Sequence, residues 1–294
     1  MKRALVLSGG GSRGAFQVGV WKYLKERNWQ PDIICGTSIG AVNAAAIGSG
    51  LDVATLEHLW TTHNRRRIYR LNLVSFMAHT LFRRAVTPVL DTGPMKDMLA
   101  KHLDFNALKQ STTRVVISAV NITTARPRFF SQEEIGIEHI LASSAMPLLF
   151  PWQVIDGAPY WDGGVMVNTP LIPALAFGAD EIIVVLLSPI GHTPQAIPAH
   201  FRLAGEHLFE QFLSAPYQSA LMARGHDDQT TRRVALLSGH TFRPGPGDPG
   251  PSITTLAPKT MLGFSSLINF SLKQARSLID QGYQTAADQL NGRI

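Results

Sequence analysis

The sequence predicts an α/β fold, a three-layer α/β/α arrangement around an open, mainly parallel sheet. Two observations predict it. Apolar runs such as Ala4–Leu7 and Glu181–Leu187 are typical of strands buried on both faces, and longer segments with helical spacing alternate with such runs. The chain has 294 residues, of which 45% are hydrophobic and 16% charged, so it can bury a sizeable core.

The elements follow in chain order. After the strand at Ala4–Leu7, helical spacing of apolar residues predicts a helix over Ala15–Glu26. Pro31 interrupts the chain, and a second strand at Ile33–Cys35 precedes a second helix at Ala41–Ile47. Further along, an antiparallel hairpin is predicted for Arg114–Asn121 with Arg128–Ser131, and a buried strand for Glu181–Leu187. A surface loop is predicted for Pro244–Pro251, a last strand for Ile253–Leu256 and a closing helical region for Ser265–Leu290.

Composition limits the class of protein. No apolar run approaches the roughly 18 residues of a membrane span, and the apolar segment at the N-terminus is too short for a signal peptide. We therefore expect a cytoplasmic protein that can bind a membrane surface peripherally. A formal net charge of +6 favours an anionic partner, either an acidic lipid surface or nucleic acid. Cys35 is the single cysteine, which rules out an internal disulfide.

The first glycine motif, SGGGSRG at Ser8–Gly14, lies between the first strand and the first helix. Through Gly9, Gly11 and Gly14 it also fits G-x-G-x-x-G, the fingerprint of dinucleotide-binding proteins. Such a protein needs an acidic residue at the carboxyl end of its second strand. Asp32 has nearly the right spacing but precedes that strand, so a dinucleotide-binding or regulatory protein is kept only as the alternative interpretation.

The second motif, GTSIG at Gly36–Gly40, occupies the carboxyl end of the second strand and matches the nucleophile elbow G-x-S-x-G. In such an elbow the serine, here Ser38, sits on a tight strand-to-helix turn with strained backbone angles. Small residues two positions away, here Gly36 and Gly40, avoid clashes. The following helix points its N-terminus at the serine and favours negative charge on the reacting oxygen. The alternative is an ordinary glycine-rich turn with a helix-capping serine.

The third motif, WDGGVMVNTP at Trp161–Pro170, places Asp162 before Gly163 and Gly164. Taken alone, an aspartate followed by two glycines is most often a plain turn. The chance occurrence of all three motifs in this order is far rarer than the chance occurrence of any one of them.

With these motifs the sequence resembles the patatin-like phospholipases. The resemblance is carried by GGGSRG at Gly9–Gly14, GTSIG at Gly36–Gly40 and DGG at Asp162–Gly164, and supported by segments such as LASSAMPLLFPWQVIDGAPYWDGG and SLIDQGYQTAADQL. It implies a single patatin-like hydrolase domain over 1–294, with a divergent segment at about 192–250. It also implies a lipid acyl hydrolase, a phospholipase or esterase, that acts on lipid ester or phospholipid substrates without a cofactor.

The resemblance further implies a Ser-Asp dyad without histidine, with Ser38 as nucleophile and Asp162 as general base. A carboxylate can accept the serine proton if burial raises its pKa toward neutrality. The oxyanion formed from the acyl carbonyl is expected to accept hydrogen bonds from backbone N–H groups of the glycine loop: Gly9, Gly10 and Gly11. The residues that support the motifs are Gly14, Gly36, Gly40, Gly163 and Gly164.

Two positions in the glycine loop keep open roles. Arg13 either faces the cavity of the site or anchors the loop. Many family members have an aspartate before the glycine run, where this chain has Ser8. The sequence does not assign to Ser8 the role that the aspartate has in those proteins.

A triad with histidine and a metal site are the other chemistries to weigh. The histidines that follow Asp162 are His192, His200, His207, His226 and His240. None follows a clear strand end, and we expect them at the protein surface. His63 and His139 precede Asp162 and are expected to be structural. We expect no metal, because the carboxylates are scattered and a lone cysteine excludes the common thiolate sites of zinc.

The segment Arg65–Arg84, RRRIYRLNLVSFMAHTLFRR, has basic ends around an apolar middle. We interpret it as a peripheral contact with an anionic membrane, with arginines on head groups and apolar side chains toward acyl chains. A pair of core-packing helices with solvated arginines is the alternative, because the apolar residues do not keep to one helical face. Nucleic acid is not expected as a partner, because no known reader module is recognisable.

Overall fold

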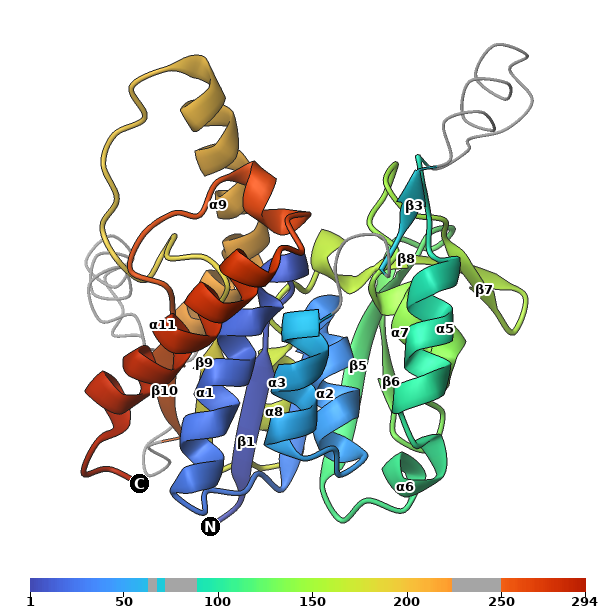
Figure 1. The fold of residues 1–294 in the computed structure, drawn as a ribbon, viewed down its shortest axis with the longest axis horizontal. Helices are drawn as coiled ribbons and strands as arrows, with labels where there is room; N and C mark the ends of the chain where they lie inside the picture. The colour runs from blue at the N-terminus through green and yellow to red at the C-terminus, as the bar shows by residue number, and fades with distance from the viewer. Residues whose placement is uncertain (63–67, 72–88, 224–249) are drawn as a thin grey trace, which may run out of the picture.

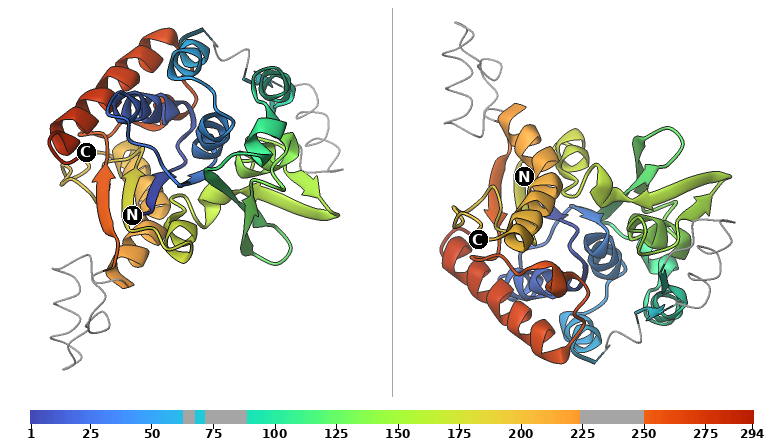
Figure 2. Two further views of the ribbon diagram at one scale, coloured as in Figure 1. Left: turned by 90° about the horizontal axis from the view of Figure 1, so that it is seen from below. Right: turned by 90° about the horizontal axis from the view of Figure 1, so that it is seen from above.

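A mixed, mainly parallel sheet runs through the molecule and carries helices on both faces (Figures 1 and 2), as the sequence predicts. The computed structural model describes residues 1–62, 68–71, 89–223 and 250–294. Its strands follow the order β10-β9-β1-β2-β5-β8-β7, with β6 also paired to β5. These strands are β1 (Arg3–Leu7), β2 (Ile33–Thr37), β5 (Arg114–Asn121), β6 (Arg126–Ser131), β7 (Gln153–Ile155), β8 (Ala158–Asp162), β9 (Glu181–Val185) and β10 (Ser252–Leu256). A small separate sheet pairs β3 (Arg70–Leu71) with β4 (Leu90–Asp91).

The predicted strands are confirmed with changes at their ends, and β1, β6 and β10 begin one or two residues earlier than predicted. β10, β9, β1, β2 and β5 run parallel, while β6 and β8 run antiparallel to β5. β2 does not end at Cys35 but continues to Thr37, because its last residues still pair with β5. β9 ends at Val185 rather than Leu187, because the Leu187 N–H donates to Ser8 Oγ at 3.0 Å instead of continuing the strand.

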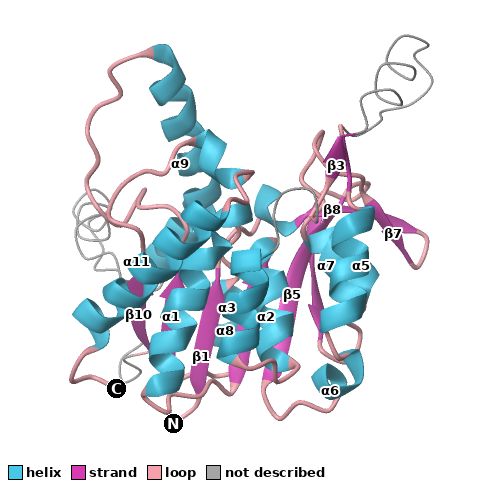
Figure 3. Cartoon of the chain, in the orientation of Figure 1, coloured by secondary structure: helices cyan, strands magenta, loops and turns pink. Residues whose placement is uncertain are grey.

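Helices account for most of the remaining described residues (Figure 3). The α-helices are α1 (Ala15–Glu26), α2 (Ile39–Gly48), α3 (Val53–Thr62), α5 (Gly93–His102), α6 (Phe105–Lys109), α7 (Ile137–Ser143), α8 (Leu171–Ala176), α9 (Phe201–Ala223) and α11 (Leu272–Leu290), and the 3-10 turns are η1 (Gly11–Gly14), η3 (Gly163–Val165) and η4 (Phe264–Leu267). The predicted closing helix divides into η4 and α11, because the Ser271 side chain caps α11. No helix was predicted for α9, which lies in the divergent segment. Within the described ranges, none of the helices combines the length and apolarity that crossing a bilayer requires.

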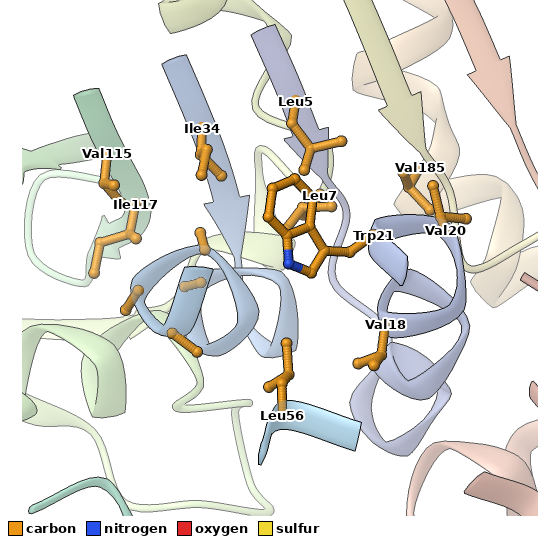
Figure 4. Packing of buried hydrophobic residues seen from close by; sticks show 14 of the residues in the cluster. Leu5, Leu7, Val18, Val20, Trp21, Ile34, Leu56, Val115, Ile117 and Val185 are labelled. Carbon is orange, nitrogen blue, oxygen red and sulfur yellow. The ribbon is translucent and has the colours of Figure 1, made fainter. Parts of the chain in front are cut away.

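Side chains of the sheet alternate between two hydrophobic clusters, which defines the three layers. From β1, Leu5 and Leu7 enter the cluster formed with α1, α2, α3 and α11, where Figure 4 shows them beside Trp21 and Ile34. From the same strand, Ala4 enters the opposite cluster, which α8 and α9 cover. Each fully buried leucine of this kind contributes roughly 1.5–3 kcal/mol to stability. This packing holds the carboxyl ends of the parallel strands at one end of the molecule.

Several predictions fall on residues outside the described ranges. They concern the Arg65–Arg84 segment apart from 68–71, the Pro244–Pro251 loop apart from its last two residues, and three histidines: His63, His226 and His240.

Candidate active site

Ser38 lies at the turn between β2 and α2, with φ 56° and ψ −123°. A positive φ is uncommon for a residue with a side chain and costs about 1–3 kcal/mol. The turn closes tightly: a Cβ added to Gly36 would collide with the Gly40 carbonyl, and one added to Gly40 would collide with the Leu7 carbonyl. The elbow therefore requires glycine at both positions that the sequence singled out.

Neighbouring side chains hold the elbow in this conformation. The Ser38 N–H donates to Ser143 Oγ at 3.0 Å, at the end of α7. Thr37 Oγ1 donates to the Val167 carbonyl at 2.8 Å and lies 2.6 Å from Ser118 Oγ. The strained serine is thus fixed on a rigid part of the sheet, which keeps its hydroxyl pre-positioned.

β5 brings Asp162 to Ser38 because it is the common partner of β2 and β8. β2 runs parallel to β5 and ends with Thr37 opposite Ser118. β8 runs antiparallel to β5, and its last residue, Asp162, lies opposite Ala119, the next residue along β5. Since β6 occupies the other edge of β5, β2 and β8 meet end to end on one edge. The last residues of β2 and β8 therefore lie close together.

The Asp162 side chain is buried, and this sets its proton affinity. Its residue is only 2% exposed, and Oδ1 accepts a hydrogen bond from the Gly164 N–H at 2.7 Å. Burial raises the pKa of Asp162 to about 7, against smaller opposing effects of the Gly164 N–H and the Ser38 hydroxyl. Among the described residues, Oδ2 has no hydrogen-bond partner of standard geometry. The distance or the angle between the Ser38 hydroxyl and the Asp162 carboxyl therefore lies outside that of a standard hydrogen bond, as is common before a substrate binds.

The glycine loop lies directly beside the elbow. A Cβ on Gly9 would collide with Asn168 Oδ1 and crowd Ser38, which shows how closely the loop approaches the serine. The Gly9 N–H already donates to the Asn168 carbonyl at 2.9 Å. In the described structure, the N–H groups of Gly10 and Gly11 make no hydrogen bond. Of the three donors that the sequence suggested, these two are left unpaired.

The other predicted glycines take up positions around this centre. Gly163 packs against Ser118 so closely that a Cβ would collide with its side chain and carbonyl. Gly164 supplies the N–H bound by Asp162. Gly14 closes η1, and its carbonyl accepts a hydrogen bond from Asn43 Nδ2 at 3.1 Å.

Arg13 anchors the glycine loop, which decides between its two predicted roles. Its guanidinium is buried and forms a salt bridge to Glu210 on α9, with Nη1 2.6 Å from Oε1. Nε donates to Ser266 Oγ at 2.7 Å and Nη2 to the Gly263 carbonyl at 2.9 Å. Sequence reasoning missed Glu210, because it lies 197 residues away in the divergent segment.

A cavity opens beside Ser38 and is almost wholly apolar. It reaches from Ser38 and Gly11 along α2, α3 and α5. Its apolar lining consists of Ile39, Val42, Ala46, Leu51, Leu56, Leu59, Trp60, Ile68, Met95, Met98, Leu99, Leu103, Phe150 and Phe270. The few other polar side chains are Thr92, His102 and Ser144. A lining of this kind suits a hydrocarbon chain.

The described hydrogen bonds connect no histidine to Ser38 or Asp162. His139 is buried, as expected of a structural residue: Nδ1 accepts from the Gly136 N–H at 3.1 Å, and its ring packs on Phe130. His192 and His200 are exposed, as expected, and partial removal of the His192 side chain from water lowers its pKa. His102 lines the cavity but was not singled out in the sequence, because the search for a triad took the order Ser, Asp, His and so the histidines that follow Asp162.

Asp32 immediately precedes β2, at the end of the strand that is remote from the elbow. A dinucleotide-binding protein needs its acidic residue at the opposite, carboxyl end of this strand. Its Oδ2 accepts a hydrogen bond from the Arg3 N–H at 2.7 Å, at the start of β1. Cys35 is buried, and burial raises the pKa of its thiol to about 12, which leaves it unreactive.

A strained serine between a parallel strand and a helix places the chain among the serine hydrolases built on an α/β sheet. Residues 5–175 match the family model described as patatin-like phospholipase, and the chain belongs to that family.

Two curated relatives and one solved structure are similar to the chain. A cGAMP-activated phospholipase of Pseudomonas aeruginosa is 28% identical over 197 residues, which cover 60% of this chain and 56% of that protein. Lysophospholipase nte1 of Aspergillus terreus is 30% identical over 193 residues, which cover 65% of this chain but 12% of that protein. The crystal structure of VipD from Legionella pneumophila aligns with a TM-score of 0.51 and 14% identity over 99% of this chain and 66% of that one. This last likeness concerns the fold alone. The chain spans about half the length of the first relative and a small part of the second.

Proposed function

We propose that the protein hydrolyses acyl esters of lipids, with Ser38 as the nucleophile and Asp162 as the general base. The observation that carries the proposal is the end-to-end meeting of β2 and β8 on β5, which brings an elbow serine to a buried carboxylate. A carboxyl with a pKa of about 7 can both accept and return a proton at neutral pH.

The proposed reaction proceeds in two halves. Ser38 Oγ attacks the acyl carbonyl carbon while its proton passes to Asp162, and the carbonyl oxygen becomes an oxyanion. The unpaired N–H groups of Gly10 and Gly11 donate to that oxyanion. The ester C–O bond then breaks, and the leaving alcohol takes the proton from Asp162. In the second half, water loses a proton to Asp162 and attacks the acyl carbonyl carbon. The bond between that carbon and Ser38 Oγ then breaks, Ser38 Oγ takes the proton from Asp162, and the fatty acid leaves.

The cavity supports a lipid acyl group as the part of the substrate that is bound. Its lining is apolar apart from a few side chains and begins at Ser38, so an acyl chain can lie there with its carbonyl at the serine. A phospholipid is the leading substrate class, in agreement with the names of the two relatives. The pairing of β10 with β9 supports the interpretation of 1–294 as one hydrolase domain.

A peripheral contact of Arg65–Arg84 with an anionic membrane in the cytoplasm stays a prediction. Changing Arg65, Arg66 and Arg67 to Gln is expected to weaken binding to anionic vesicles, each basic residue contributing about 1 kcal/mol at such a surface. Hydrolysis of a short soluble ester is expected to stay nearly unchanged.

Covalent labelling tests the proposed nucleophile. A fluorophosphonate probe is expected to modify Ser38 alone, and Ser38→Ala is expected to abolish labelling and to lower turnover by up to about a millionfold. Ser144→Ala is the matched control, because Ser144 lines the same cavity, and it should keep full labelling. Undiminished labelling of Ser38→Ala, or saturable NAD or FAD binding that weakens in Gly10→Ala, would defeat the proposal.

A further inference from the structure

Two buried amide side chains, Gln17 of α1 and Asn43 of α2, have no part in the proposed chemistry. Each residue is 1% exposed, and Asn43 is the only polar residue of α2, whose sequence is IGAVNAAAIG. Asparagine is disfavoured inside a helix, and a buried amide destabilises the fold unless it is hydrogen-bonded. The partners of these two amides therefore indicate what they do.

The two amides bind the two ends of the glycine loop. Gln17 Nε2 donates to the Ser8 carbonyl at 2.8 Å, and Asn43 Nδ2 donates to the Gly14 carbonyl at 3.1 Å. Asn43 Nδ2 also donates to Gln17 Oε1 at 2.9 Å, which joins the two side chains. The unpaired N–H groups that are proposed to bind the oxyanion lie between these two held ends of the loop.

Trp60 of α3 fixes the direction of these hydrogen bonds and connects them to the cavity. Its Nε1–H donates to Asn43 Oδ1 at 3.1 Å, and an indole nitrogen can only donate. The Asn43 oxygen therefore faces Trp60, and its nitrogen faces the loop and Gln17 Oε1. The Trp60 ring lines the cavity beside Ser38, and a Cβ added to Gly14 would come within 2.9 Å of its Cη2.

We call these three side chains the polar network: Gln17, Asn43 and Trp60. They come from α1, α2 and α3, which lie next to one another on one face of the sheet (Figure 1).

A run of glycines needs support of this kind. Glycine lets a substrate approach the main chain closely, but it has no side chain that restrains its own conformation. Gly11 has a φ of 58°, in the left-handed region. Oxyanion donors act by being oriented before the charge forms. Hydrogen bonds to the main chain on both sides of the run restrict its movement and so preserve that orientation.

We propose that Gln17 and Asn43 are positioning residues that hold the oxyanion donors of the glycine loop in place, with Trp60 fixing the orientation of both amides. The inference rests on the proposed function, because the donors have a task only if an oxyanion forms at the nucleophile. Neither amide is among the described residues that line the cavity. The two amides therefore control the rate of turnover rather than the affinity for the substrate.

Steady-state hydrolysis of p-nitrophenyl butyrate by the full-length protein tests the proposal. Gln17→Met keeps the length of the side chain and removes both of its hydrogen bonds. The kcat should fall by about 10- to 100-fold through misplaced donors, while KM stays within about twofold. The rates are compared at a temperature at which circular dichroism shows the variants to be folded.

Gln132→Met is the matched control. Gln132 is 8% exposed, its Nε2 donates to the Ser111 carbonyl at 2.9 Å, and its Oε1 accepts from the Val115 N–H at 2.8 Å. It therefore loses the same kinds of hydrogen bond as Gln17→Met, at the end of β5 that is remote from the elbow. Both variants should lower the midpoint of thermal unfolding, but Gln132→Met should keep kcat within about twofold.

Two further variants test whether the network acts as a unit. Trp60→Phe keeps an aromatic ring in the cavity wall and removes only the donor to Asn43, so kcat should fall by about three- to tenfold. It decides alone if Gln17→Met does not fold. Gln17→Met combined with Asn43→Leu should lose little more than Gln17→Met does, because residues of one network are not additive. A double loss equal to the product of the single losses would overturn the network.

The outcomes separate this inference from the proposed function. Equal losses of kcat in Gln17→Met and Gln132→Met, or a rise in KM with kcat unchanged in Gln17→Met, would overturn the positioning role alone. Ester hydrolysis that persists in Ser38→Ala would instead overturn the proposed nucleophile. A loss of kcat confined to the polar network, with hydrolysis abolished in Ser38→Ala, supports both.

Discussion

Two buried carboxylates lie on either side of the glycine loop, and their neighbours give them different properties. Asp162 and Glu210 are each 2% exposed. Glu210 on α9 has the Arg13 guanidinium at 2.6 Å. Asp162 at the end of β8 forms no salt bridge within the described residues, and it is bound by the Gly164 N–H and approached by the Ser38 hydroxyl.

The difference shows that two equally buried carboxylates can be suited to different roles. A buried carboxylate beside an arginine is held in one place and serves to join two elements, here η1 and α9. A buried carboxylate without a cation resists ionisation, and its pKa moves to about 7 in the case of Asp162. Only the second kind can exchange a proton with a serine at neutral pH.

The largest expected effect is on the activity of the Asp162 variant. Asp162→Asn keeps the shape of the side chain and removes the proton acceptor, so kcat/KM for a soluble ester should fall by about 10³–10⁴, equal to roughly 4–5.5 kcal/mol. Its free energy of unfolding at pH 8 should not fall, because the variant no longer buries a charge. Steady-state kinetics and urea unfolding check both. A loss as large in Glu210→Gln, with the fold intact, would abolish the distinction between the two carboxylates.

The next effect is on stability and belongs to Glu210. Glu210→Gln leaves the Arg13 guanidinium buried without its charge partner, which should lower the free energy of unfolding by about 3–5 kcal/mol. Glu206→Gln is the matched control on the same side of α9, because its contact with Arg202 is longer, at 3.8 Å, and it should cost about 1 kcal/mol or less. Urea unfolding of the two variants compares them directly. Equal stabilities would show that the Arg13 pair does not hold α9.

A third effect appears in the pH dependence. Below about pH 7 Asp162 is protonated and cannot act as a base, so kcat/KM should rise about tenfold per pH unit up to about 7 and then level off. Stability should change in the opposite direction. Because the carboxyl has its pKa raised from 3.8 to about 7 on folding, the folded protein holds a proton that the unfolded chain has lost, and stability falls as pH rises through that window. In Asp162→Asn this part of the stability profile should vanish. A flat activity profile between pH 5 and 8 would exclude Asp162 as the base.

The smallest expected effect is that of removing both members of the ion pair. Arg13→Met combined with Glu210→Leu replaces two buried charges by apolar side chains, and such replacements are often neutral or stabilising. The free energy of unfolding should lie within about 1 kcal/mol of the unchanged protein, far from the loss in Glu210→Gln. Urea unfolding of the double variant measures it. A double variant as unstable as Glu210→Gln would mean that Arg13 and Glu210 have shape-specific roles beyond neutralising each other.

The elbow was predictable from the sequence because its determinants are local. Gly36, Ser38 and Gly40 lie within five residues, and the collision of a Cβ at either glycine with nearby backbone explains why no other residue fits. The strand before them and the helix after them follow from apolar runs and spacing. The proposed Ser-Asp dyad was predicted only from the resemblance, since nothing local to Asp162 distinguishes a base from a turn residue.

What the sequence determined by itself was the set of elements and the strained turn, because backbone sterics and hydrophobic periodicity act over a few residues. Tertiary structure alone decided which buried carboxylate lies beside a cation and which side of α9 faces water. The register of β5 places Asp162 beside Ser38, and Arg13 pairs with a glutamate 197 residues away. A helix with apolar and acidic sides shows the same 3.6-residue period whichever side turns inward. The orientation of α9 depends on its contact with the buried Arg13, and no local sequence pattern predicts that contact.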